Sequence, residues 1–280
     1  MKTKKSLGRK KNNSMISFWK NKKVLITGNT GFKGSYLTLF LKNLGAEVYG
    51  YSLKPNVTES LFYELNIDSM VSEQKYANIK NIKELNKFCL KVKPDIAFHF
   101  AAQPLVFESY KKPKNTFLTN VIGTVNFLEC LRDCDIGSVV VATSDKCYLN
   151  NETQQSFKKD SPLGGKDPYS ASKACAEIVT MAWKESFLKC PISTVRAGNV
   201  IGGGDWSKNR ILVDLVKSYS RNKILHIRNP YSIRPWQHVN DSIIAYILIA
   251  QKQFNNPNNS SNWNVGPIKV SKATVLDIVD

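Results

Sequence analysis

Short apolar segments alternate with longer amphipathic stretches from residue 23 onward. Runs rich in β-branched residues predict strands at residues 23–27, 47–51, 95–100, 138–143 and 192–196. Apolar residues at helical spacing predict helices at residues 32–44, 82–91, 116–132, 168–187 and 241–251. Strands that alternate with helices are typical of a parallel sheet covered on both faces. The pattern therefore predicts a doubly wound α/β fold.

Three glycines, Gly28, Gly31 and Gly34, lie between the first predicted strand and the first predicted helix. In this context the first glycine permits a tight turn, the second lets the backbone approach a pyrophosphate, and the third lets helix pack on strand. The free N–H groups at the start of the helix favour phosphate. An ordinary glycine-rich turn is the alternative, but the flanking strand and helix favour a dinucleotide site on a Rossmann-type doubly wound parallel sheet.

The second predicted strand ends without the acidic residue that would bind the ribose of NAD. Ser52 stands there, followed by Leu53 and Lys54. Ser52 can hydrogen-bond a ribose hydroxyl, whereas Lys54 would tolerate the extra phosphate of NADP. These residues leave the choice between NAD and NADP open.

Tyr169 and Lys173 lie four residues apart near the start of a predicted helix, so their side chains share one face. A tyrosine with a pKa of about 10 is a poor base, and a neighbouring ammonium stabilises its phenolate. The pair is therefore a candidate to take a proton from an alcohol as hydride leaves. Ser144, which follows the strand at 138–143, can bond the same alcohol oxygen. The Tyr-x-x-x-Lys spacing alone is common on surface helices. It indicates a catalytic pair here because Ser144 follows a predicted strand that precedes this helix.

Asp145 and Lys146 follow Ser144 directly, at the carboxyl end of a predicted strand. Doubly wound folds bind ligands at this end of the sheet. The alternative is a solvated turn, but the position favours a role in the site.

Beyond Gly202 the regular alternation breaks into segments rich in Gly, Pro, Trp and Arg. We expect residues 22–198 to form an NAD-binding domain and residues 199–280 to form a smaller substrate lobe, interleaved with it. Residues 1–21 are expected to be a disordered basic tail, because six Lys or Arg fall within the first 14 residues without an acid.

The net charge of +18 raises the question of a nucleic-acid partner. No zinc finger or RNP-like aromatic strand accompanies it, so we expect none, and the charge suits anionic small ligands. No apolar run is long enough to span a membrane, and we expect no secretory signal, because no apolar region follows the basic N-terminus. Six cysteines without paired spacing and three histidines predict no metal site and suit a reducing cytoplasm.

Longer stretches make a family resemblance specific. They are HFAAQPLV (99–106), TSDKCY (143–148), GGKDPYSASKA (164–174), RAGNVIGGGDW (196–206) and IRPWQHV (233–239). Together with the glycine motif and the Ser144–Tyr169–Lys173 triad, they resemble the extended short-chain dehydrogenases/reductases, and within these the CDP-glucose 4,6-dehydratase family. Asp145–Lys146 resembles the CDP-glucose branch, because dehydratases acting on dTDP-glucose carry an Asp-Glu pair there.

The resemblance implies bound NAD, a nucleotide-sugar substrate and an internal redox cycle. Tyr169 would deprotonate the C4 hydroxyl as hydride leaves C4, water would leave across C5–C6, and hydride would return to C6. Asp145 would protonate the leaving hydroxyl, and Lys146 would act at C5 or shape the charge of the site. The implied cofactor contacts, besides the glycines, Tyr169 and Lys173, are Thr30, Phe32, Ser52, Asn78, Ile79, Ala101, Ala102, Gln103 and Thr143, and the implied substrate contacts are Asn199, Arg210 and Arg234.

The sequence also departs from the family. Asn78 replaces an aspartate that contacts adenine, Phe107 replaces an arginine, and Asn209 replaces an aspartate. The chain stops at Asp280, where relatives continue, so the lobe is expected to be truncated. Relatives dimerise through two helices, here 116–132 and 168–187, which implies a homodimer.

Two other functions remain open. An epimerase or reductase of the same superfamily would keep Tyr169 and Lys173 but need no acid and base beside Ser144. A truncated remnant would bind nucleotide without turnover.

Overall fold

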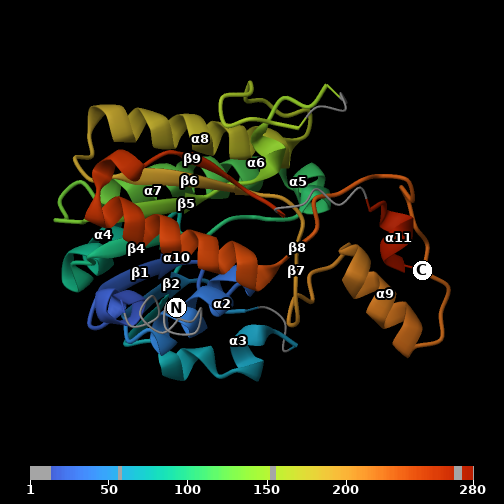
Figure 1. Ribbon diagram of the computed structural model, residues 1–280, viewed down its shortest axis with the longest axis horizontal. Helices are drawn as coiled ribbons and strands as arrows, with labels where there is room; N and C mark the ends of the chain where they lie inside the picture. The colour runs from blue at the N-terminus through green and yellow to red at the C-terminus, as the bar shows by residue number, and fades with distance from the viewer. Residues whose placement is uncertain (1–13, 56–58, 152–155, 268–272, 280) are drawn as a thin grey trace, which may run out of the picture.

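The structure, a computed structural model, describes residues 14–55, 59–151, 156–267 and 273–279. Within these residues, seven strands form one sheet in the order β3-β2-β1-β4-β5-β6-β9, and every neighbouring pair is parallel (Figure 1). The strands are β1 (Lys23–Thr27), β2 (Glu47–Ser52), β3 (Glu73–Tyr76), β4 (Ile96–His99), β5 (Ser138–Ala142), β6 (Ile192–Ala197) and β9 (Asn262–Val265). The predicted doubly wound sheet is confirmed.

Helices cover both faces of the sheet because successive strand residues point to opposite sides. On one face Val24 and Ile26 pack with α2 (Phe32–Asn43) and α10 (Val239–Asn255). On the other face Leu25 packs with the second set of helices. These helices are α4 (Ile82–Val92), α7 (Gly123–Cys130) and α8 (Pro168–Ser186). The two cores fix the positions of the carboxyl ends of the strands, where the candidate site lies.

The shorter elements connect these layers. The helix predicted at residues 116–132 is a continuous run of α6 (Pro113–Phe117), the π-helical turn η2 (Leu118–Ile122) and α7. The other short helices are α3 (Leu61–Glu64), η1 (Ile67–Met70), α5 (Val106–Lys111), η3 (Asp145–Cys147) and η4 (Pro257–Asn259). Among the described residues, no helix combines the length and the apolar character needed to cross a membrane.

The segment assigned to the substrate lobe divides between two places. β7 (Val200–Ile201) pairs with β8 (Gln237–His238), and beyond them α9 (Ile211–Ser220) and α11 (Val275–Val279) lie at one end of the molecule (Figure 1). By contrast, α10 covers the sheet and β9 pairs with β6. Residues 239–265 therefore pack with the sheet and its helices, while α9 and α11 lie apart from them.

The predicted disordered tail is wrong for residues 14–21. Residues 14–19 are helical, and the Trp19 side chain is 0% exposed. Its ring packs edge-on against Phe18 at 5.1 Å and lies 6.5 Å from the ring of Phe98 on β4. Burial of this large apolar ring orders a segment that its charge alone would leave in water. The first 13 residues of the predicted tail lie outside the described residues.

His99, the last residue of β4, is a buried histidine within the second core. Its Nδ1 lies 2.7 Å from Thr27 Oγ1, its Nε2 lies 3.2 Å from Thr124 Oγ1, and its ring stacks on Phe127 at 4.6 Å. Burial, with a smaller effect of the Lys173 charge, lowers the pKa of His99 to about 3. The side chain is therefore neutral in the folded protein at neutral pH.

This depressed pKa should make folding sensitive to acid. Between the ordinary histidine pKa of 6.5 and the folded value of about 3, only the unfolded chain binds this proton. The free energy of unfolding should then fall by about 1.4 kcal/mol per pH unit as pH drops through that window. His99→Gln keeps hydrogen-bonding groups but does not titrate. The slope of its unfolding free energy against pH should therefore be smaller by the contribution of one proton. Urea unfolding of both proteins across this range measures the difference, and equal slopes would contradict it.

Candidate active site

The glycine-rich turn between β1 and α2 has the geometry of a phosphate cradle. Gly28 has a φ of 77°, a conformation that glycine adopts without strain. A Cβ on Gly28 would lie 2.6 Å from the Ala101 nitrogen, and one on Gly34 would lie 2.2 Å from the Gly28 oxygen. Gly31 is exposed at the start of α2, which has no side-chain cap. The first N–H groups of α2 are thus open to an anion, and the residues fit the pyrophosphate of a dinucleotide.

The roles of the second and third glycines, Gly31 and Gly34, can be separated by substitution. Gly31 has a φ of −80°, and its Cβ would come no closer than 3.4 Å to another atom, so Gly31→Ala should change the free energy of unfolding by less than about 1 kcal/mol. The new methyl group would nevertheless occupy the approach to α2. We expect NAD⁺ affinity, measured by calorimetry, to fall by about tenfold or more, which corresponds to about 1.4 kcal/mol.

Gly34→Ala is the matched comparison for this prediction. Its Cβ would collide with the backbone of Gly28, so it should destabilise the fold by roughly 1–3 kcal/mol. If Gly31→Ala bound NAD⁺ as tightly as the unmodified protein, the cradle assignment would be wrong.

Residues predicted to bind the rest of the cofactor surround the ends of β1, β2 and β4. Thr30 Oγ1 lies 2.7 Å from Ser52 Oγ and donates to the Leu53 oxygen at 2.8 Å. Asn78 Oδ1 accepts the Lys80 N–H at 3.0 Å, which folds the chain into a local turn after β3. Phe32 opens α2, the Ile79 side chain packs against Gly123 on α7, and Ala101, Ala102 and Gln103 follow β4.

Two of the predicted cofactor contacts use their side chains within the fold instead. Gln103 Nε2 donates to Thr116 Oγ1 at 2.9 Å, and its Oε1 accepts the Leu105 N–H at 2.6 Å. The Thr143 hydroxyl donates to the carboxylate of Glu177. Neither side chain is free to reach out, so any contact from these residues to a cofactor comes from their backbone.

The three residues of the predicted triad meet where β5 ends and α8 begins. Asp167 caps α8 by accepting the Ser170 N–H at 3.0 Å, which sets Tyr169 in the first helical turn. The Tyr169 hydroxyl lies close enough to Ser144 for that side chain to lower the pKa of the phenol. Lys173, one turn further along α8, donates to the Ala142 oxygen at 3.2 Å. The three side chains therefore form one candidate catalytic group.

Burial sets the protonation of this group. It raises the pKa of Tyr169 to about 12, against smaller opposing effects of the Ser144 hydrogen bond and the Arg210 charge. It lowers the pKa of Lys173 to about 8, opposed by the carboxylate of Glu177. Tyr169 is therefore a neutral phenol at neutral pH, and it needs nearby positive charge before it can act as a base.

Asp145 and Lys146 form the short turn η3 that follows Ser144. Ser144 Oγ donates to Asp145 Oδ1 at 3.0 Å and accepts the Lys146 N–H at 3.2 Å. Partial burial raises the pKa of Asp145, while Lys146, the Ser144 hydrogen bond and Lys33 oppose the rise. A carboxyl group with a raised pKa retains its proton to higher pH, which suits a proton donor.

A cleft of about 350 Å³ opens beside this turn. Asn199 and Arg234, two of the predicted substrate contacts, line it together with Asp145 and Lys146. Arg210, the third, forms an ion pair of 3.7 Å with Asp205 and lies within electrostatic reach of Tyr169. The sequence did not indicate the other lining residues, which include Tyr148, Phe157, Lys166 and Asp167.

Two further charged residues of the site were not recognised in the sequence. Lys33 lies inside the glycine motif, where it was treated as a spacer, and its Nζ lies 3.4 Å from the Tyr246 hydroxyl. Burial and the nearby charges of Arg210 and Lys173 lower its pKa to about 8. Glu177 lies four residues after Lys173, on the same helical face, and this spacing was the signal that could have found it.

Comparison with known proteins assigns the fold and site to a class. Residues 24–266 match the model of the NAD dependent epimerase/dehydratase family, and the chain belongs to this family. Ser52 and Lys54 left the choice between NAD and NADP open. Membership of this family decides it in favour of NAD.

Among curated proteins, the chain is 44% identical over 274 residues to the CDP-glucose 4,6-dehydratase of Salmonella typhimurium, covering 94% of this chain and 76% of that protein. It is 29% identical over 248 residues to the dTDP-D-glucose 4,6-dehydratase of Dictyostelium discoideum, covering 82% and 56%. A solved dTDP-glucose 4,6-dehydratase from Streptomyces venezuelae with bound NAD superposes with a TM-score of 0.77 at 22% identity, covering 92% of this chain and 79% of that one. This last likeness supports the fold.

Proposed function

We propose that the protein is a sugar-nucleotide 4,6-dehydratase that converts CDP-glucose to CDP-4-keto-6-deoxyglucose and water. The observation that carries the proposal is the proximity of Tyr169 to Ser144 and Asp145, which both act on its pKa, together with the 3.0 Å bond from Ser144 Oγ to Asp145 Oδ1. It joins a candidate base for alcohol oxidation to a candidate proton donor. An epimerase or a reductase has no use for a proton donor beside Ser144, because no hydroxyl group leaves its substrate. The choice of CDP rests on the 44% identity to the Salmonella enzyme.

Each catalytic side chain has one task in the proposed reaction. When bound, NAD⁺ supplies the hydride acceptor for C4 of the sugar and the donor for C6, so the reaction is redox-neutral overall. Tyr169 takes the proton of the C4 hydroxyl, and Ser144 donates a hydrogen bond to the same oxygen. Lys173 stabilises the Tyr169 phenolate through its positive charge.

Loss of water uses the turn after β5. Asp145 gives its proton to the C6 hydroxyl, which leaves as water once the 4-keto group has acidified the C5 proton. Lys146 is the candidate to accept that C5 proton and later return it. Asn199 and Arg234 line the same cleft and, with Arg210, provide the polar and cationic groups that hold a pyrophosphate.

Turnover of defined substrates tests the proposal. The protein with NAD⁺ is incubated separately with CDP-glucose, dTDP-glucose, UDP-glucose and GDP-mannose, and products are separated and weighed by mass spectrometry. We expect loss of one water from CDP-glucose, with kcat/KM at least about tenfold above the other nucleotides. An isomer of unchanged mass would indicate an epimerase, and binding without any product would indicate a non-catalytic remnant.

We also propose that the protein is a homodimer that pairs through α8 and the α6–η2–α7 run. Apolar side chains are exposed on both, including Phe117 (37%), Ile122 (44%), Ile178 (52%) and Met181 (48%). A second copy would remove them from water. Sedimentation should give the mass of two chains, and Ile178→Glu should shift the population to one chain. A monomeric unmodified protein would contradict the proposal.

We propose, finally, that the protein works in the cytoplasm. All six cysteines are free thiols, and the buried Cys89 and Cys130 sulfur atoms lie 2.8 Å apart as a hydrogen-bonded pair. Such thiols persist in a reducing compartment. Fractionation of cells that express the chain tests this location.

A further inference from the structure

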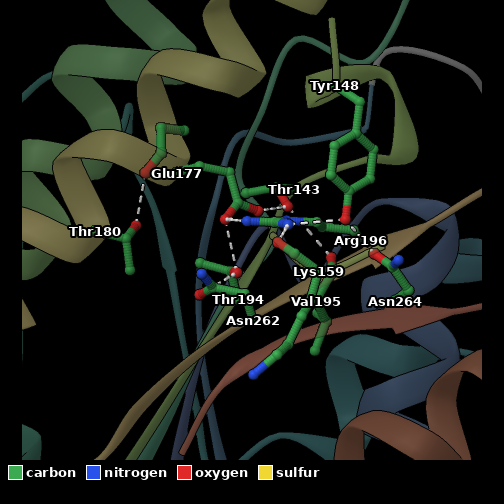
Figure 2. Close-up of polar contacts among 11 residues, drawn as sticks. Thr143, Tyr148, Lys159, Glu177, Thr180, Thr194, Val195, Arg196, Asn262 and Asn264 are labelled. Carbon is green, nitrogen blue, oxygen red and sulfur yellow. Dashed lines mark hydrogen bonds and ion pairs between the residues drawn. The ribbon is translucent and has the colours of Figure 1, made fainter. Parts of the chain in front are cut away.

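A fully buried ion pair lies behind the catalytic helix (Figure 2). Arg196 NH2, at the end of β6, donates to Glu177 Oε2, on α8, at 2.6 Å, and the two side chains are only 2% and 1% exposed. Removing two charges from water costs more than their attraction returns unless additional hydrogen bonds satisfy both groups. The hydrogen-bond partners of each charged side chain therefore indicate the role of the ion pair.

The carboxylate holds the strands that carry the catalytic group. The hydroxyl of Thr143, the residue before Ser144, donates to Glu177 Oε1, and Thr194 Oγ1 donates to Oε2 at 2.8 Å. Because Glu177 lies one helical turn after Lys173, these bonds fix α8 against the end of β5. Tyr169 lies on this same helix, and Ser144 directly follows Thr143.

The guanidinium holds the wall of the substrate cleft. Arg196 NH1 donates to the Tyr148 hydroxyl at 2.8 Å and to the Lys159 oxygen at 2.7 Å, and the Tyr148 hydroxyl donates to Asn264 Oδ1 at 2.5 Å (Figure 2). The Tyr148 ring stacks on Phe157 at 4.7 Å, and both residues line the cleft. Glu177 thus contacts the residue before Ser144, and Arg196 contacts the aromatic wall formed by Tyr148 and Phe157.

We propose that Glu177 and Arg196 are positioning residues of the dehydratase reaction, which couple the Ser144–Tyr169–Lys173 group to the Tyr148–Phe157 wall. Neither is among the described residues that line the cleft, so both act through others. The inference rests on the proposed function. It implies different kinetic effects for the two residues, Glu177 on kcat and Arg196 on substrate binding.

Single variants test this division. Glu177→Gln keeps the shape but removes the charge that holds α8 to β5, and it should lower kcat by about 10- to 100-fold with a smaller change in KM. Arg196→Lys keeps a positive charge beside Glu177 but loses the planar fork that reaches Tyr148. It should raise KM for CDP-glucose, and weaken CDP-glucose binding measured by calorimetry, by about tenfold. Glu185→Gln, an exposed site on the same helix, should match the unmodified protein in each measurement.

A double variant separates positioning from stability. Glu177→Met with Arg196→Met removes both charges together, so the thermal midpoint should recover relative to Glu177→Gln. Its kcat should stay at least about tenfold low and its KM high, because Thr143 and Tyr148 have lost their partners. Recovery of both midpoint and wild-type kinetics would overturn the proposal, as would single variants with unchanged kinetics per folded molecule.

The proposed function and the positioning role fail in different ways. No product from the unmodified protein would refute the dehydratase assignment. Calorimetric binding of CDP-glucose needs no turnover, so an Arg196→Lys affinity equal to that of the unmodified protein would still refute the positioning role.

Discussion

Tyr169→Phe is expected to abolish formation of the 4-keto-6-deoxy product while leaving NAD⁺ affinity nearly unchanged. The substitution removes only the hydroxyl of a side chain that is 8% exposed, so the ring keeps its packing. Ser144 also keeps its 3.0 Å bond to Asp145. Loss of a general base lowers turnover by about 100- to 10,000-fold. Product formation and NAD⁺ calorimetry measure the two expectations.

Tyr219→Phe is the matched control for this prediction, because Tyr219 is 88% exposed on α9. It removes the same atom without touching the catalytic group and should turn over at the normal rate. Unchanged turnover in Tyr169→Phe would refute the proposed mechanism. Loss of NAD⁺ binding together with turnover would instead make Tyr169 a cofactor-binding residue.

Asp145→Asn should stop the reaction at a later point. An amide oxygen still accepts the Ser144 hydrogen bond, but the amide does not release a proton to a leaving hydroxyl. Alcohol oxidation should therefore proceed, whereas loss of water should slow by about 100- to 10,000-fold. Reduced nicotinamide should accumulate, together with a 4-keto sugar that retains its C6 oxygen.

Stopped-flow absorbance of reduced nicotinamide, followed by mass spectrometry of the quenched sugar, measures this accumulation. The unmodified protein should show little accumulation, since elimination and hydride return follow at once. Product at the normal rate would exclude Asp145 as the acid. Absence of any reduced nicotinamide would place Asp145 in the oxidation step.

Local patterns predicted the parts of the fold that local chemistry determines. The glycine motif, the strand runs and the Tyr169–Lys173 spacing all depend on near neighbours in the sequence. The edge strands β3 and β9 escaped prediction, because EQKY is largely polar, NWNV is half polar, and neither contains a buried position. Their strand structure comes from pairing with β2 and β6, which lie far away in the chain.

The residues whose contacts the sequence did not indicate depend on distant partners in the same way. Trp19 lies next to a basic segment, so the sequence did not indicate that its ring is buried beside the ring of Phe98. Thr143 was assigned to the cofactor by resemblance, but its hydroxyl is taken by Glu177, which is 34 positions later in the chain. Glu177 on α8 is in turn paired with Arg196 on β6. No window along the sequence contains such a network.

The bond between Tyr148 and Asn264 has a consequence for the order in which the protein becomes competent. Synthesis delivers Ser144, Tyr169, Lys173 and Arg196 from the ribosome well before Asn264, which lies on β9, the strand nearest the C-terminus among the described residues of the sheet. A nascent chain can therefore assemble its oxidation chemistry before the aromatic wall acquires its final anchor. The Tyr148 hydroxyl therefore gains its bond to Asn264 only once β9 has paired with β6.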